Sequence, residues 1–147
     1  MGVAIKLDGY DELMAELNRI DDTLSGKLVR DMVKAAGEVV AAEAKRLCPR
    51  GDPADSPDLK PLNETIAVEL RDYGVRQLAV VGPQYPAGAH GHLVENGHEV
   101  ISHGKRTGTR TEPKPFVRPA FDAEKSNAER IIAVELRNGI EQVGKEK

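Results

Sequence analysis

The stretch that decides the fold is LSGKLVRDMVKAAGEVVAAEAKRL, residues 24–47. Its apolar side chains recur every three or four residues and form one broad stripe, made of Leu24, Leu28, Met32, Ala35, Ala36, Val39, Val40 and Leu47. This spacing is typical of an amphipathic helix that packs one face on a core. At 1.5 Å per residue the helix is roughly 35 Å long, and Pro49 ends it.

Small residues in the second half of this helix allow another element to come close to its backbone: Ala35, Ala36, Gly37, Ala41, Ala42 and Ala44. Two kinds of partner fit such a surface. One is another part of the same chain, and the other is a neighbouring subunit. Both interpretations stay open at the level of the sequence.

Further elements are predicted on either side of this helix. Near the N-terminus, Val3, Ile5 and Leu7 alternate as in a strand, and a short helix is expected from about Tyr10 to Ile20. At the other end, Pro119 suits the first turn of a last helix that runs to about Val143. The apolar stripe of that helix is Phe121, Ala128, Ile131, Ile132, Leu136, Ile140 and Val143.

Strand patterns lie between the two long helices. Ile66 to Leu70 and Leu78 to Val81 alternate around the turn residues Asp72-Tyr73-Gly74, which predicts an antiparallel hairpin, and residues 99–102 read as a short strand. The segments at about 50–61 and 103–115 read as flexible loops. We therefore predict one α+β domain over residues 1–147. Its small antiparallel sheet packs against the long helix of the N-terminal half and the C-terminal helix.

Composition narrows the function. Charged residues make up 31% and hydrophobic residues 39%, as in ordinary globular domains, but aromatics make up 3%, so the core is thin and gains from neighbouring subunits. A net charge of −3 argues against broad binding of duplex DNA. No signal peptide and no apolar run of membrane-spanning length is visible, so we expect synthesis in the cytoplasm and no membrane contact.

Catalytic signals are weak. Cys48 is the sole cysteine, which excludes an internal disulfide, and a helix C-terminus should raise the pKa of its thiol. The four histidines, His90, His92, His98 and His103, lie near Glu95 and Glu99, but no helix is expected there to align them as metal ligands. We therefore expect no catalytic residues, no metal and no cofactor. A metal-dependent hydrolase built on this histidine-rich loop is one alternative.

The segment after the histidines is strongly basic. Between His103 and Arg118 it holds five cations, Lys105, Arg106, Arg110, Lys114 and Arg118, against the acid Glu112. One interpretation is a solvated loop. Another is an arm whose Lys105, Arg106, Arg110 and Lys114 reach an acidic partner, either another subunit or nucleic acid. A nucleic-acid-binding regulatory or toxin-like module is therefore a second alternative function.

Three local patterns together resemble a known family. They are LNETI at residues 62–66, HLVENGH at 92–98 and PFVRPAF at 115–121. They are similar to the leucine–hydroxyl–isoleucine, valine–glutamate–aromatic–glycine and proline–hydrophobic–arginine–proline–alanine segments of neck and tail-completion proteins of long-tailed phages. Asn96 departs from the usual aromatic, His90 stands where a tyrosine is frequent, and the loop before Pro61 is longer and more acidic.

The resemblance implies a non-enzymatic virion protein at the head–tail junction. It would form a ring, of six copies for example, and would contact head–tail connector and tail proteins, with passing DNA as a transient contact. The candidate interface residues are Glu95, Gly97, Pro115, Phe116, Arg118, Pro119 and Phe121.

The prolines give this last motif a physical role. Pro115 and Pro119 stiffen the segment between them, so a partly exposed Phe116 and Arg118 are expected as interface anchors. Glu95 is the expected partner of Arg118, within or between subunits. The alternative is that Phe116 and Phe121 cap the core of the monomer.

Overall fold

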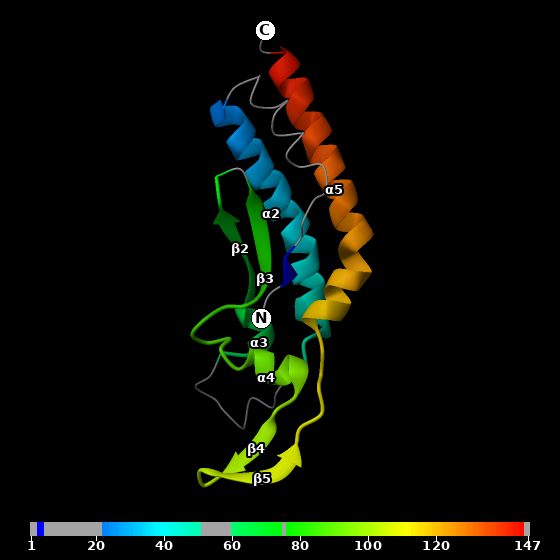
Figure 1. Ribbon diagram of the computed structural model, residues 1–147. Helices are drawn as coiled ribbons and strands as arrows, with labels where there is room; N and C mark the ends of the chain where they lie inside the picture. Colours follow the sequence, from blue (N-terminus) through cyan, green and yellow to red (C-terminus); the bar gives the residue numbers. More distant parts are fainter. Residues whose placement is uncertain (1–2, 5–21, 51–59, 75, 146–147) are drawn as a thin grey trace.

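The computed structural model describes residues 3–4, 22–50, 60–74 and 76–145. Two long helices, α2 (Asp22–Leu47) and α5 (Val117–Lys145), run side by side in opposite directions (Figure 1). A three-stranded sheet packs on α2, and its edge strand at residues 3–4 also contacts α5. The class is therefore α+β, as predicted, with α2 as the element that both of its neighbours contact.

Helix α2 confirms the central prediction. Met32, Ala36 and Val40 on its predicted stripe are 0% exposed. Val29 and Val33, which the predicted stripe omits, are buried as well. They are buried because α2 is covered on two sides, by the sheet and by α5, so its buried face is wider than a single stripe.

The small residues of α2 serve packing within the chain. A Cβ atom at Gly37 would lie 2.9 Å from Val68 Cγ1 and 3.0 Å from the Ala79 Cβ, so the sheet approaches the helix backbone at this point. Ala36, Ala41 and Ala44 are buried against the same core, whereas Ala42 is exposed. The interpretation of close packing inside the chain is thus confirmed for these buried positions.

The sheet has the order β1 (Val3–Ala4), β3 (Gln77–Pro83), β2 (Ile66–Asp72), and every pair is antiparallel. Val68 stands opposite Val81, and Leu70 stands opposite Ala79, which places these residues on the face that packs on α2. The predicted hairpin is confirmed. At its turn, Gly74 N–H donates to Asp72 Oδ1 over 2.8 Å.

Three shorter segments complete the described chain before α5. They are α3 (Leu62–Thr65), α4 (Gly91–Asn96) and a second antiparallel sheet of β4 (Glu99–Ser102) and β5 (Lys105–Arg110). The strand predicted at 99–102 is confirmed as β4. The prediction of a flexible loop over 103–115 is wrong for residues 105–110, because they pair with β4 as a strand. This hairpin lies beyond the ends of the long helices in Figure 1.

The last helix begins at Val117, so Pro119 is its third residue, within the predicted first turn. Three predictions fall outside the described residues: the helix at 10–20, the strand positions Ile5 and Leu7, and most of the loop at 50–61. The assignment of residues 1–147 to a single domain stays a prediction. None of the described helices is long and apolar enough to cross a membrane.

Candidate functional site

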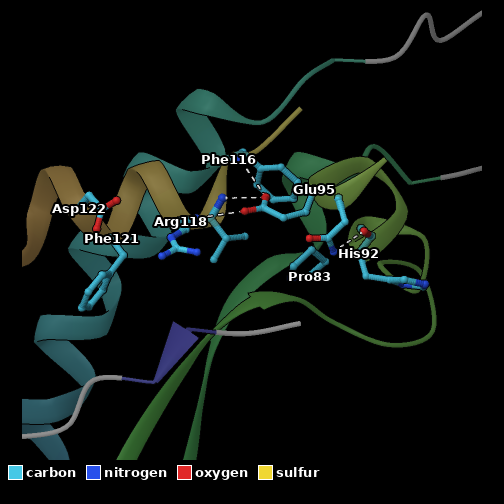
Figure 2. A pocket seen from close by; sticks show the side chains of 10 residues that line it. Pro83, His92, Glu95, Phe116, Arg118, Phe121 and Asp122 are labelled. Atoms are coloured by element: carbon cyan, nitrogen blue, oxygen red, sulfur yellow. Dashed lines mark hydrogen bonds between the residues drawn. The ribbon is translucent and has the colours of Figure 1, made fainter. Parts of the chain in front are cut away.

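The start of α5 is held by a side chain that is distant in sequence. Glu95, in α4, accepts hydrogen bonds from three successive backbone N–H groups: Phe116 N and Val117 N reach Oε2 over 2.8 and 3.1 Å, and Arg118 N reaches Oε1 over 3.2 Å. The first N–H groups of a helix have no partner within the helix, and that end carries partial positive charge. A carboxylate there accepts hydrogen bonds from these N–H groups, and its negative charge is attracted by the partial positive charge of the helix start. Figure 2 shows the Glu95 carboxylate facing this end of α5.

This cap changes the expected role of Arg118. Glu95 does contact Arg118 within the chain, but through the backbone N–H and not through the guanidinium group. The ion pairs that the described residues form do not include Arg118, and its side chain is exposed. The geometry thus leaves the Arg118 side chain available at the surface beside the cap.

Phe116 belongs to the core. It is 0% exposed and is the largest fully buried side chain in the described chain, so the expectation that it is partly exposed is wrong. Its ring is buried in the same core cluster as Val117 and Ala120, because burial of a large aromatic ring is strongly favourable, while its backbone N–H is bonded to Glu95. Phe121 is half-buried and packs on the same core. The alternative of a core-capping Phe116 is the correct one.

A pocket of about 420 Å³ opens beside this cap (Figure 2). Pro83, Gly91, Phe116, Val117 and Phe121 supply apolar lining, and its polar lining comes from His92, Glu95, Asn96, Arg118 and Asp122. Three of the predicted interface residues besides Phe116, namely Glu95, Arg118 and Phe121, therefore line one hollow. We refer to it as the pocket.

Residues 97–114 extend away from the rest of the chain after α4 and return to it just before α5, close to where they left. We call this segment the arm. At its root, the His98 N–H donates to Thr111 Oγ1 over 3.0 Å, and the Thr111 N–H donates to the His98 carbonyl over 2.9 Å. The Lys114 N–H then reaches the Val94 carbonyl over 2.9 Å. Together with the Glu95 cap, these bonds fix how the arm projects from the rest of the chain.

Gly97 is required at this root. Its φ is +66°, a conformation that favours glycine, and a Cβ atom there would lie 2.5 Å from the Thr111 carbonyl oxygen. The predicted role of Gly97 at an interface is untested, but the structure gives it a clear local one. It lets the two ends of the arm lie against each other.

The arm is exposed over its outer length. Every residue of β5 is exposed, and the two strands turn at His103 and Gly104, whose φ values are +50° and +75°. Arg106 lies 3.5 Å from Glu99, whereas none of the ion pairs among described residues involves Lys105, Arg110 or Lys114. Three of the four predicted partner-binding cations are therefore not engaged in ion pairs on this arm.

The sequence contained a signal for this hairpin that the loop interpretation missed. Strand β4 and strand β5 are separated by two residues, the second of which is glycine. Positive φ at both central residues is the geometry that two-residue hairpin turns prefer. The distant partners of Glu95 and Thr111 had no comparable local signal.

A family model described as "Bacteriophage HK97-gp10, putative tail-component" matches residues 11–97, more than half of the chain. The chain belongs to this phage tail-component family. No curated protein and no solved structure matches it. Membership implies a structural place in the virion and contact with other virion proteins.

The family match ends where the arm begins. It covers α2, the β2–β3 hairpin and α4 with Glu95, and it stops at Gly97. The remaining part of this tail-component protein, the arm and α5, is joined to the matched part by the Glu95 cap. Besides the cap, α5 packs along α2, and the Lys114 N–H donates to the Val94 carbonyl, so both the core and these bonds join the two portions.

His92, His98 and His103 of this tail-component protein each have a local partner. The structure corrects one expectation, because His92 lies on the short helix α4. His92 Nδ1 lies 2.8 Å from the Ala89 carbonyl, and His98 Nδ1 lies 3.1 Å from Thr111 Oγ1. Within the described ranges, no three His, Cys, Asp or Glu residues are grouped so that they could hold a metal ion.

Cys48 is buried at the end of α2. Burial, and to a smaller extent the nearby charge of Glu95, raise the pKa of its thiol to about 11. The predicted direction is correct, although the main cause is desolvation. At neutral pH the thiol is protonated, which is the wrong state for a nucleophile.

Proposed function

We propose that this tail-component protein is a structural subunit of a ring at the head–tail junction of a long-tailed phage, in the neck or tail-completion layer, with six copies in the ring. Family membership supports a structural role in the virion. The observation that carries the ring is the arm, which is fixed at its root and uncovered on both faces along β5.

The physical argument concerns what such an arm needs. A two-stranded hairpin without a packed face is marginally stable in water. Here the root bonds hold the arm in one direction, so it loses little conformational freedom when it meets a partner. A rigid, uncovered arm on a subunit with a thin core fits a protein that is completed by its neighbours.

The same groups support a non-enzymatic role. Glu95 is engaged as a helix cap, His98 is engaged at the arm root, and Cys48 is buried and protonated. Glu95, His98 and Cys48 are among the side chains that a nucleophilic or acid–base mechanism could use, and these contacts and this burial occupy them otherwise. The proposed partners are therefore other copies of the chain, the head–tail connector on one side and tail proteins on the other.

The test is removal of the protein from the phage. A nonsense mutation in its gene should give filled heads and separate tails that do not join, and supply of the intact chain should restore tailed particles. Imaging of restored particles should place the chain at the junction. Normal tailed particles without the chain, or a position elsewhere in the virion, would reject the proposal.

Transient contact with passing DNA is the second candidate for the basic residues. The observation that favours it is the exposure of Lys105, Arg110 and Lys114 on the arm. Few phosphate contacts give weak binding with a shallow dependence on salt. Binding of purified protein to duplex DNA, measured over a range of salt concentrations, tests this contact.

A further inference from the structure

The arm carries an exposed apolar side chain on its charged surface. Ile101 in β4 is 64% exposed, although Val100 beside it is half-buried. Ile101 stands opposite Arg106 in the hairpin, and Glu99 stands opposite Arg110. Residues opposite one another in a hairpin share a face, but the register shifts between these two pairs. The Arg106–Glu99 ion pair, at 3.5 Å, joins the two pairs across the shift, so one face of the arm presents Ile101 and Arg106 together with Glu99 and Arg110.

The pocket offers the complementary surface. Pro83, Phe116 and Phe121 give it an apolar lining, and its volume of about 420 Å³ is large enough for a branched aliphatic side chain and its neighbours. Asp122 at the pocket is exposed, and the ion pairs among described residues leave its carboxylate unpaired. An apolar hollow beside a free acid fits an apolar anchor beside a free cation.

Charge supports the same match. The arm holds Lys105, Arg106, Arg110 and Lys114 against Glu99 and Glu112, so 4 − 2 gives it a net charge of +2. The pocket holds Glu95 and Asp122 against Arg118, so 1 − 2 gives it −1. Opposite charge on two surfaces favours their encounter and suppresses contact between two like surfaces.

The arm does not dock into the pocket of its own chain. Gly97, Thr111 and Lys114 fix the root of the arm, and β5 remains exposed throughout. Figure 1 shows the hairpin extending away from the start of α5. Six residues of strand span about 20 Å, which is a reach suited to an adjacent subunit.

We infer that the arm of one copy docks into the pocket of a neighbouring copy, with Ile101 seated against the partly exposed Pro83 and Phe121 and with Arg110 facing Asp122. This inference rests on the proposed ring. Each copy gives one arm and receives one, which is a head-to-tail contact that closes into a ring when the rotation between copies closes. The pocket is complete when the neighbour supplies Ile101.

Cross-linking in assembled particles tests the contact. Two chains, Ile101→Cys and Arg118→Cys, are supplied together to a phage that lacks the protein, and the tailed particles are oxidised. A covalent dimer is expected from the mixture and from neither chain alone, since Cys48 is buried. Ser102→Cys replaces Ile101→Cys in the control, because Ser102 is adjacent in β4 and on the opposite face of the arm; that mixture should give little dimer.

A second measurement uses purified full-length protein. Ile101→Asp should weaken self-association about tenfold or more, as expected for a central apolar anchor, whereas Ser102→Asp should change it far less. Asp122→Arg should weaken it as well, and Arg110→Asp in the same chain should restore it. Thermal melts should show that all of these chains stay folded, because the substituted side chains are exposed.

The outcomes separate this inference from the proposed function. Particles that contain both cysteine chains at the junction without the expected dimer would overturn the docking and leave the junction role intact. If Arg110→Ala lowers the salt dependence of duplex-DNA binding by about one unit while Ile101→Asp assembles normally, the arm contacts DNA instead. Absence of the chain from the junction would reject the proposed function itself.

Discussion

The described chain has two regions built on opposite principles: the body around α2 and the arm at residues 97–114. In the body, Met32, Ala79 and Ala120 are fully buried by elements from distant parts of the sequence. In the arm, β5 is exposed at every position, and its order depends on hydrogen bonds at the root. The body stabilises itself by burial of apolar surface. The arm keeps its direction through these root bonds with little burial, and we propose that its packing partner is another molecule.

The largest loss of folding stability is expected from Phe116→Ala, which tests whether Phe116 belongs to the body. Because Phe116 is fully buried beside Val117 and Ala120, its loss should lower the free energy of unfolding by about 3–5 kcal/mol. Urea unfolding followed by circular dichroism measures the change. A loss below about 1 kcal/mol would show that Phe116 is not part of the body.

Replacement of the cap should have the next largest effect. Glu95→Ala removes the acceptor of three N–H groups at the start of α5, and we expect a loss of about 1–3 kcal/mol in unfolding free energy. Amide exchange at Phe116 to Arg118 should accelerate. Glu112→Ala is the matched control, since Glu112 is exposed in the arm and makes none of these bonds; equal effects from both changes would contradict the cap.

A substitution at the root of the arm should loosen the arm and leave the body unchanged. Gly97→Ala places a methyl group 2.5 Å from the Thr111 carbonyl at a positive φ, so we expect the His98–Thr111 bonds to weaken and the arm to loosen. Limited proteolysis should cut the arm faster while α2 keeps its protection. Gly104→Ala is the control, because φ is also positive there but no atom lies within 4 Å of the added Cβ.

The smallest effect on folding is expected from Ile101→Ala. Ile101 is 64% exposed, so the free energy of unfolding should change by less than about 0.5 kcal/mol. Calorimetry of the monomer at low concentration measures this. A loss of 2 kcal/mol, on the order of a core substitution, would place Ile101 inside the body and remove the contrast between the two regions.

The Cys48 thiol should make the stability of the body depend on pH at high pH. Its pKa in the folded protein, about 11, lies above the ordinary value, so the folded state holds this proton more tightly than the unfolded state. The contribution of Cys48 to stability should therefore be lost as pH rises from about 9 towards 11. Wild type should lose more stability over that range than Cys48→Ala, measured by parallel denaturant titrations.

Local patterns in the sequence determined the helices and strands of the body. The spacing in residues 24–47 predicts α2 because a helix presents every third or fourth residue on one face. Alternation around Asp72 to Gly74 predicts the β2–β3 hairpin, since strand side chains alternate between faces. Each of these signals is contained in one short stretch of sequence, so it can be recognised without reference to distant parts of the chain.

Tertiary structure alone decided the site. Glu95 caps Phe116 and Val117 from more than twenty residues away, and packing of the start of α5 on the core buries Phe116, which was expected as a partly exposed anchor. The pocket joins Pro83 of β3 to Asp122 of α5. Sequence periodicity reports which side of an element is apolar, but not which distant backbone groups lack partners. The hydrogen bonds of the Glu95 carboxylate and the buried position of the Phe116 side chain therefore form only when the whole chain has packed.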